Sequence, residues 1–251
     1  FTSNQALVDI ITQHFFAETP AYFALSYFRI FQEYYYPKGG TGVFVDKMSA
    51  LIKEHGGIIR TNTEIQQVDP ITKTVATTEG EIIAYRHLLW TADQKRLYNS
   101  IRLDSQKHPD LAAALTEKQA FLADKIGNDS ILSLFLTTDL DSDFFRNIAT
   151  GHVFYTPSRA GQSTAGPLPL DGSRAEIESW LRKYLSLTTY EISIPALRDP
   201  NLAPPGKTGL VISILFDFNL TKRIAGQGWY EEFKQFAADV IVETLDKTLY
   251  P

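Results

Sequence analysis

The sequence predicts an α+β fold, in which a mostly antiparallel or mixed sheet is covered by helices, and two observations support this class. Residues 130–249 alternate β-rich segments with amphipathic ones, but connections such as residues 195–208 are too irregular for repeated βαβ units. Residues 58–90 hold short β-rich segments separated by turn residues, which is typical of a β-ribbon. The 251 residues suffice for one large domain or two small ones with a real core.

The N-terminal region is rich in aromatic residues, because 11 of the 31 Phe, Trp and Tyr residues lie within the first 36 positions. Residues 6–16 and 21–36 predict two helices, separated by a Thr-Pro pair that suits the start of a helix. The second helix carries a wide apolar face formed by Phe23, Tyr27, Phe28 and Phe31. This face is either ordinary core, or the wall of an apolar channel or a membrane-facing lip.

A glycine-rich turn follows the second helix, at the sequence YPKGGTG of residues 36–42. It opens a helix that is expected to end near residue 55, where two glycines supply the C-cap. A glycine turn before a helix presents free backbone N–H groups and permits close approach by a flat ligand or a phosphate. The turn matches neither the dinucleotide-binding fingerprint GxGxxG nor a P-loop.

The remaining elements follow from periodicity and turn residues. Residues 130–136 form a nearly continuous apolar run, which predicts a strand in a central position of a sheet. The loop at residues 158–173 is rich in Gly, Pro and Ser and is expected to be mobile. The other expected elements are strands at 58–61, 64–68, 74–78, 81–90, 153–155, 188–194 and 209–218, and helices at 108–123, 174–185 and 229–249.

Composition excludes several classes of function. The chain contains no cysteine, which excludes disulfides, thiolate nucleophiles and Cys-type zinc sites. The net charge of −5 implies no basic face, so no nucleic-acid partner is expected. The histidines lack metal-ligand spacing, so no metal site is predicted. No signal peptide is visible in a chain that begins without Met, and we expect an excised piece of a cytoplasmic protein.

Few side chains are candidates for chemistry. Glu191 is a lone acid inside an expected strand, and it faces either solvent or a pocket in which it anchors a ligand. Asp139, Asp141 and Asp143 alternate like the start of a calcium loop, but the Gly and the final acid of such a loop are missing. We therefore expect a solvated turn with a helix cap there. No catalytic acid, base or nucleophile can be named.

Two segments of the chain resemble a known family. The first is YPKGG at residues 36–40, followed by a helix, by GGII at 56–59 and by the β-ribbon. The second is TYEISIPALRDP at residues 189–200, followed by APPGK at 203–207. In combination these motifs resemble the phytoene dehydrogenase and carotenoid isomerase family of FAD-dependent oxidoreductases, within the flavin amine oxidase superfamily. The resemblance runs from about residue 30 to about residue 250.

The resemblance implies an internal fragment, because the GxGxxG fingerprint that opens this family is not in the sequence. It implies a helical part of a substrate domain at residues 1–38, a strip of a FAD domain at 39–97, and a substrate-binding domain at 98–251. Pro37, Gly39 and Gly40 would lie near the isoalloxazine ring of FAD, and Ala92 and Asp93 would end the strand that returns to the cofactor domain. FAD is expected in the full-length parent and not in this chain by itself.

The resemblance also implies an activity, in which hydride transfer by the flavin oxidises, saturates or isomerises double bonds of an apolar polyene or lipid-like substrate. Phe23, Tyr27, Phe28, Phe31 and Glu191 would contact this substrate. Peripheral attachment to a membrane is plausible by the same resemblance and would rest on the aromatic front end. The alternative is a catalytically silent domain that binds an apolar ligand or another protein.

Overall fold

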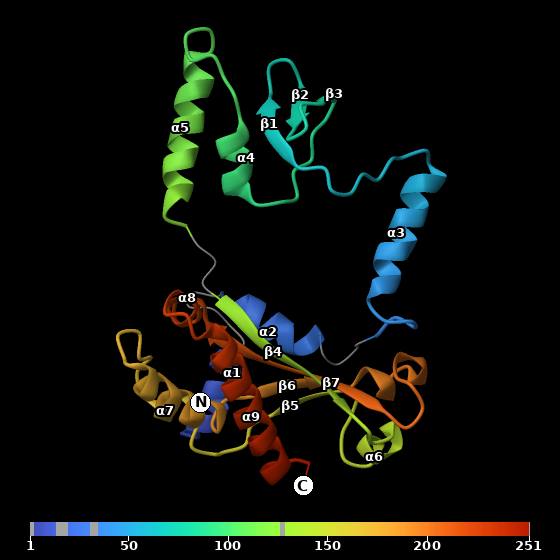
Figure 1. Cartoon of the computed structure of the whole chain (residues 1–251), viewed down its shortest axis with the longest axis vertical. Coiled ribbons are helices and arrows are strands. Elements are labelled where there is room, and N and C mark those ends of the chain that lie inside the picture. The colour runs from blue at the N-terminus through green and yellow to red at the C-terminus, as the bar shows by residue number, and fades with distance from the viewer. Residues whose placement is uncertain (1–2, 14–19, 31–34, 126–128, 251) are drawn as a thin grey trace. The chain divides into compact units, whose positions relative to one another are not determined.

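The computed structural model describes residues 3–13, 20–30, 35–125 and 129–250 and confirms the predicted α+β class (Figure 1). Contacts divide the chain into two compact units, and each is described by itself. Unit 1 consists of Phe1–Asp46 and Asn128–Pro251, and unit 2 consists of Lys47–Gly127. The domain boundaries expected at residues 39 and 98 stay a prediction.

Unit 1 is built on a four-stranded antiparallel sheet with the strand order β4-β7-β6-β5. The long strands β4 (Asp129–Thr138) and β7 (Thr208–Asp217) pair over ten residues, and the short strands β6 (Tyr190–Ser193) and β5 (His152–Tyr155) continue the sheet. The helices of unit 1 are α1 (Gln5–Gln13), α2 (Ala21–Ile30), α6 (Ser142–Arg146), α7 (Arg174–Leu185), α8 (Phe218–Gly226) and α9 (Tyr230–Thr248), with the 3-10 turns η1 (Gln162–Ala165), η2 (Pro195–Leu197) and η3 (Pro200–Leu202).

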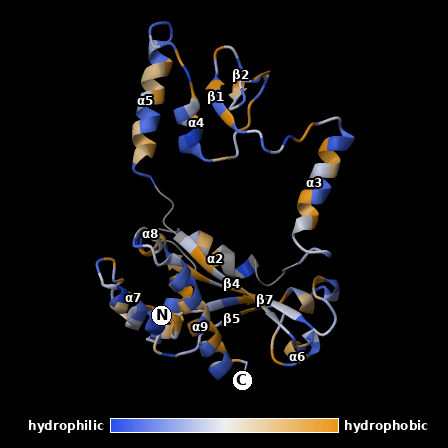
Figure 2. Ribbon diagram, viewed as in Figure 1, coloured by the Kyte–Doolittle hydropathy of each residue, from blue (hydrophilic) through white to orange (hydrophobic). Residues whose placement is uncertain are grey.

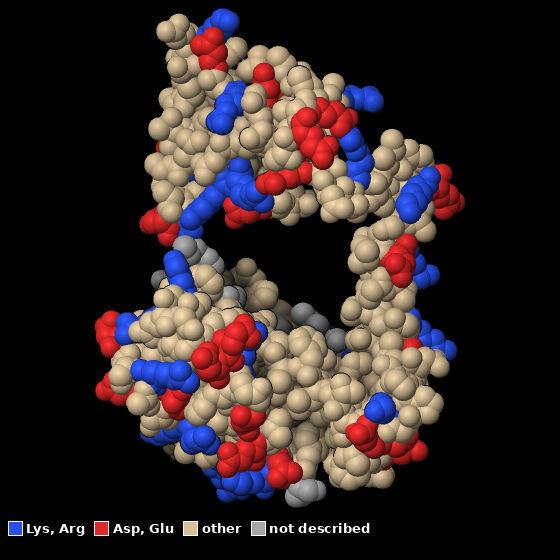
Figure 3. Space-filling model, viewed as in Figure 1, with Lys and Arg blue, Asp and Glu red and all other residues tan. Residues whose placement is uncertain are grey.

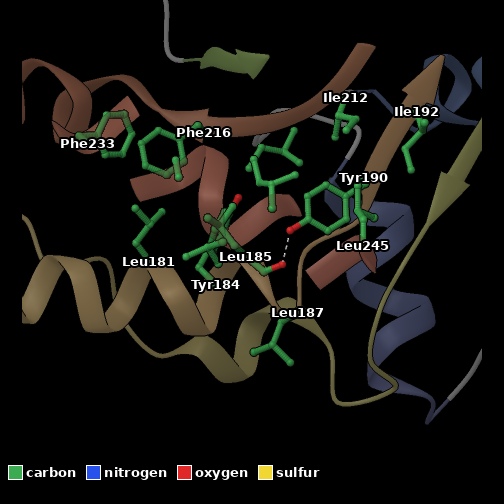
Figure 4. Close-up of a cluster of buried hydrophobic side chains, with 14 of the residues drawn as sticks. Leu181, Tyr184, Leu185, Leu187, Tyr190, Ile192, Ile212, Phe216, Phe233 and Leu245 are labelled. Atoms are coloured by element: carbon green, nitrogen blue, oxygen red, sulfur yellow. Dashed lines mark hydrogen bonds between the residues drawn. The ribbon is translucent and has the colours of Figure 1, made fainter. Parts of the chain in front are cut away.

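One face of this sheet carries the hydrophobic core. Burial alternates strictly along β7, so Leu210, Ile212, Ile214 and Phe216 lie on the core face and the residues between them lie on the other. Helices α7, α8 and α9 and strand β6 supply most of the other side chains of the core, to which Phe145 of α6 and Ala165 of η1 also belong. Figure 4 shows this cluster and the hydrogen bond from the Tyr190 hydroxyl to a backbone carbonyl of α7. The opposite face of the sheet, here called the open face, is where functional side chains can lie.

Unit 2 contains a β-ribbon of β1 (Ile65–Asp69), β2 (Thr74–Thr77) and β3 (Ile82–Ala84), followed by α4 (Gln94–Ser100) and α5 (Pro109–Ala123). Helix α3 (Gly42–Glu54) crosses from unit 1 into unit 2. It has no buried residue, although hydrophobic and hydrophilic residues both occur along it (Figure 2). Charged side chains of both signs are interspersed on the face of the molecule in Figure 3.

Three expected strands differ from the structure. Residues 58–61 and 85–90 were expected in strands but pair with no strand in the described chain, and only Ile82–Ala84 of the latter segment forms β3. The central position expected for residues 130–136 is wrong, because β4 is an edge strand of the described sheet. Its apolar run arises because Ile131 and Phe135 are exposed on the open face, while the alternate leucines face the core. The loop expected at 158–173 contains η1.

None of the helices in the described part of the chain is both long and apolar enough to cross a lipid bilayer. Among the same residues, no group of His, Asp and Glu side chains is placed so that it could hold a metal ion.

Candidate functional site

The two segments that carry the family resemblance meet in unit 1. The backbone N–H of Gly39 donates a hydrogen bond of 2.8 Å to Oδ2 of Asp199, across 160 positions of sequence. Asp199 is 5% exposed, and it lies in the loop that follows β6. The glycine turn is therefore attached to the loop that leaves the sheet, and we call this contact the glycine-turn junction.

The turn itself depends on its glycines. Gly39 and Gly40 have φ angles of +87° and +84°, a region that side chains with a Cβ disfavour. The N–H of Gly40 donates to the carbonyl of Pro37 at 3.0 Å and closes the turn. A Cβ at Gly39 would lie 2.9 Å from Cγ2 of Val43, at the start of helix α3. A side chain at position 39 would therefore be strained by the positive φ and would require the Val43 side chain to move.

Asp199 gathers three hydrogen-bond donors around one carboxylate. In addition to Gly39, Oδ1 accepts from the backbone N–H of Asn201 at 3.1 Å and from its side-chain amide at 3.0 Å. The Gly39 N–H, the Asn201 donors and the charge of Lys38 hold the pKa of Asp199 below its usual value. The carboxylate is thus ionised at neutral pH and is a permanent acceptor for the turn.

The structure corrects one expectation about this turn. The N–H groups of Gly39 and Gly40 are both used within the protein, so they are not free to bind a phosphate. Gly39 is exposed and Gly40 is buried. What the turn offers is an exposed stretch of backbone without side-chain atoms at Gly39, and this suits a flat ring better than an anion.

Arg198 connects the junction to the sheet. Its guanidinium carbon lies 5.3 Å from the centre of the Tyr36 ring, within the range of a cation–π contact. The Arg198 side chain also covers Gly151, where an added Cβ would lie 2.6 Å from Cγ and Nε of the arginine. Gly151 immediately precedes β5, so only glycine permits this close approach. The junction and the first residue of β5 are therefore neighbours.

That first residue, His152, pairs with Glu191 on the open face of the sheet. Nε2 of His152 and Oε1 of Glu191 are hydrogen-bonded at 2.9 Å. The His152 side chain is 11% exposed and that of Glu191 is 46% exposed. The ring of Phe154 lies 5.1 Å from the imidazole, and Ser213 is opposite Glu191 in the register. A hydrogen-bonding pair thus lies beside an aromatic side chain.

The other predicted site residues are not all brought together. Phe23 lies in α2 with 52% of its surface exposed. Tyr27 and Phe28 also belong to α2, but their side chains lie outside the described residues, as does Phe31 altogether. Ala92 and Asp93 belong to unit 2, where the Asp93 carboxylate accepts from the N–H of Arg96 and caps α4. Their role toward a cofactor stays a prediction.

Sequence reasoning missed two side chains of this site. Asp199 belongs to one of the two family motifs, but no role was predicted for it. An aspartate next to a proline predicts only a turn. His152 was one histidine among five, and its partner is 39 residues away. Only the antiparallel register of β5 and β6 brings His152 and Glu191 together.

Comparisons with known proteins add little. No protein-family model matches the chain, and no curated protein matches it. Among solved structures, reduced UDP-galactopyranose mutase is similar with a TM-score of 0.47 and 13% identity, over 72% of this chain and 32% of that one. The PF1083 protein from Pyrococcus furiosus is similar with a TM-score of 0.44 and 15% identity, over 79% of this chain and 40% of that one. This chain thus spans less than half the length of either structure.

Proposed function

We propose that this chain is the substrate-binding part, with a strip of the cofactor-binding part, of a FAD-dependent oxidoreductase. The bond between Gly39 and Asp199 carries the proposal, because it joins the two segments on which the family resemblance rests. Neither segment is diagnostic when taken singly, and a hydrogen bond between them across 160 positions supports a common purpose. The proposed substrate is an apolar polyene or a similar lipid-like molecule with double bonds.

The residues of the glycine turn fit a flavin ring. The exposed Gly39 offers backbone without a side chain, and Asp199 fixes its position from the buried side. Pro37 and Gly39 would contact the ring by this surface, and the buried Gly40 would shape the turn behind them. When bound, FAD supplies the hydride chemistry, and the protein binds and orients the substrate.

The open face of the sheet supplies a surface for an apolar substrate. Ile131, Phe135 and Phe154 place apolar side chains on it, and the His152–Glu191 pair supplies hydrogen-bonding groups at one end. Pockets for small molecules are mostly apolar and contain a few placed polar groups. Glu191 would thus act as an anchor for the substrate and not as a group that reacts.

Flavin content tests the proposal. The protein, expressed from its complete gene and purified, should show the visible absorbance of a flavin and release FAD in a one-to-one ratio on denaturation. Gly39→Ala should reduce this ratio several-fold, because the new methyl group meets Val43 at a positive φ. Gly42→Ala is the matched control, since nothing lies within 4 Å of its added Cβ.

Absence of flavin from the full-length protein would overturn the proposal. The alternative, a catalytically silent domain that binds an apolar ligand, would then be favoured if the protein still bound a fluorescent fatty acid or retinoid. A Gly39→Ala variant with a full flavin content would remove the glycine turn from the cofactor site and would leave the rest of the proposal in place.

A further inference from the structure

A row of polar side chains crosses the open face of the four-stranded sheet. The hydroxyl oxygens of Ser133 in β4 and Ser213 in β7 are hydrogen-bonded at 3.0 Å. Ser213 is opposite Glu191 of β6 in the register, and Oε1 of Glu191 is 2.9 Å from Nε2 of His152 in β5. Each of the four strands thus contributes one side chain, and we call these four residues the polar row.

Apolar side chains flank the polar row on both sides along the strands. Ile131 is opposite Leu215 on one side of the row, and Phe135 is opposite Val211 on the other. Ile131 and Phe135 are 63% and 74% exposed, and they lie about 14 Å apart at ~3.4 Å per residue. A molecule that covers both apolar areas therefore also covers the polar row between them.

Covering the row with hydrocarbon alone is unfavourable. The side chain of Glu191 is 46% exposed, so a bound molecule would take water away from its carboxylate. Removing water from a carboxylate without supplying another hydrogen-bond donor costs free energy. A carboxylate has about four lone-pair sites, so it can accept from a ligand as well as from His152. A hydroxyl group at the row would replace the lost water.

The charges on the sheet favour a neutral donor over an anion. The four strands contain three acids, Asp129, Glu191 and Asp217, and neither lysine nor arginine. Arg198 lies in the loop after β6, where its guanidinium contacts the ring of Tyr36. A ligand carboxylate at the row would meet the carboxylate of Glu191, whereas a hydroxyl can donate to it and is complementary to the row.

We propose that the substrate is a polyene or similar lipid-like molecule that carries a hydroxyl group, and that Glu191 accepts the hydrogen of this hydroxyl. The apolar part of the molecule covers Ile131 and Phe135. This inference rests on the proposed function and narrows its substrate class from hydrocarbons to neutral alcohols. Glu191 determines specificity by binding and takes no part in hydride transfer.

Three polyenes that differ at one end test the inference: all-trans-retinol, its methyl ether and retinoic acid. Binding to the protein expressed from its complete gene is measured by quenching of tryptophan fluorescence. Retinol should bind about tenfold more tightly than the ether, because the ether has no hydrogen to donate to Glu191. Retinoic acid should also bind more weakly than retinol, because its carboxylate is repelled by Glu191.

Two variants of Glu191 separate the acceptor from the charge. Glu191→Leu removes the acceptor and should bring retinol and its methyl ether to equal affinity. Glu191→Gln keeps an acceptor but removes the charge, so it should bind retinoic acid more tightly than the unmodified protein does. Thr137→Val is the matched control, because Thr137 is exposed on the open face of β4 outside the polar row. Its three affinities should be unchanged.

The outcomes distinguish this inference from the proposed function. Equal affinity of the unmodified protein for retinol and the ether, or a preference for retinol that survives Glu191→Leu, would overturn the inference. Neither result changes the flavin content by which the proposed function is tested. Binding of none of the three polyenes would overturn the apolar substrate class, and this inference with it.

Discussion

The carboxylate of Asp199 organises the candidate site through a small number of atoms. Its two oxygens accept from Gly39 and from both donors of Asn201, while the side chain stays almost entirely buried. Hydrogen bonds to an ionised acceptor are stronger than those between neutral groups. Ordering glycine costs more backbone entropy than ordering any other residue. The conformation of the two-glycine turn is therefore fixed by a residue outside the turn.

The ionisation of Asp199 should be visible at Gly39. Because folding lowers the pKa of Asp199, its stabilising effect is complete above the ordinary Asp value of about 3.9 and disappears as pH falls through the lower folded value. The amide resonance of Gly39 should therefore titrate with a midpoint below about 3.9 in NMR spectra of the chain. The Asp199→Asn variant should abolish this titration and shift the resonance already at neutral pH.

Asp246→Asn provides the control for that experiment, because Asp246 is exposed on α9 and the exchange removes the same charge. The Gly39 resonance should be unchanged in this variant. A Gly39 resonance that does not move between neutral and acidic pH would show that the hydrogen bond to Asp199 is absent in solution.

At the scale of elements, local signals predicted most of the fold. Ser173 and Glu176 form a reciprocal capping box, so α7 begins where the sequence predicts it. The β-rich run at residues 209–218 likewise predicted a strand, and β7 occupies Thr208–Asp217. The pairing of strands could not be predicted from local signals, because a segment forms a strand only when it hydrogen-bonds to a neighbouring strand. Residues 58–61 and 85–90 have strand-like composition and no described partner, and β4 has a buried-strand composition at an edge.

The same limit applies to the site. Gly39, Gly40 and Glu191 could be named as candidate site residues from their residue types. Consecutive glycines before a helix, and a single acid inside a strand, are unusual. Their partners could not be inferred, since Asp199 is 160 positions from Gly39 and His152 is 39 positions from Glu191. Contacts between residues so far apart in the sequence depend on the topology of the fold. The pairing register of the strands cannot be inferred from a single sequence.

Helix α2 exposes apolar side chains that are suited to contact with a membrane. Tyr22, Phe23 and Leu25 are 74%, 52% and 75% exposed, an apolar surface that water disfavours. We expect the chain to sediment with neutral phosphatidylcholine vesicles, and salt should not weaken this binding, because the net charge of −5 offers no attraction to lipid. Replacing these three residues by serine should reduce the bound fraction several-fold.

The matched control for α2 lies in α3. Phe44 and Val45 are 56% and 61% exposed, so the double serine variant removes a similar kind of apolar surface from another helix. It should leave vesicle binding intact. Equal binding by the α2 variant and the unmodified chain would remove α2 from any membrane contact.

At the scale of the whole molecule, the two units differ in how many of their side chains are buried. The contiguous hydrophobic cluster lies entirely in unit 1. In the described part of unit 2, only Val68, Val75 and Thr77 are buried, and α4 and α5 contain no buried residue. Unit 2 therefore lacks the burial that stabilises an independent domain.

Hydrogen exchange should separate the two units. Amides protected by the core of unit 1, in α7, β7 and α9, open only with a large part of that unit, whereas those of unit 2 open with little loss of burial. Corrected for intrinsic rates, protection in unit 2 should be about a hundredfold lower, which corresponds to ~2.8 kcal/mol at 1.4 kcal/mol per factor of ten. Ile212→Ala, which makes a cavity in the unit 1 core, should lower protection there and leave unit 2 unchanged. Equal protection in both units, or a loss in unit 2 caused by Ile212→Ala, would show that the chain opens as one cooperative body, in which unit 2 is stabilised by more than its own three buried side chains.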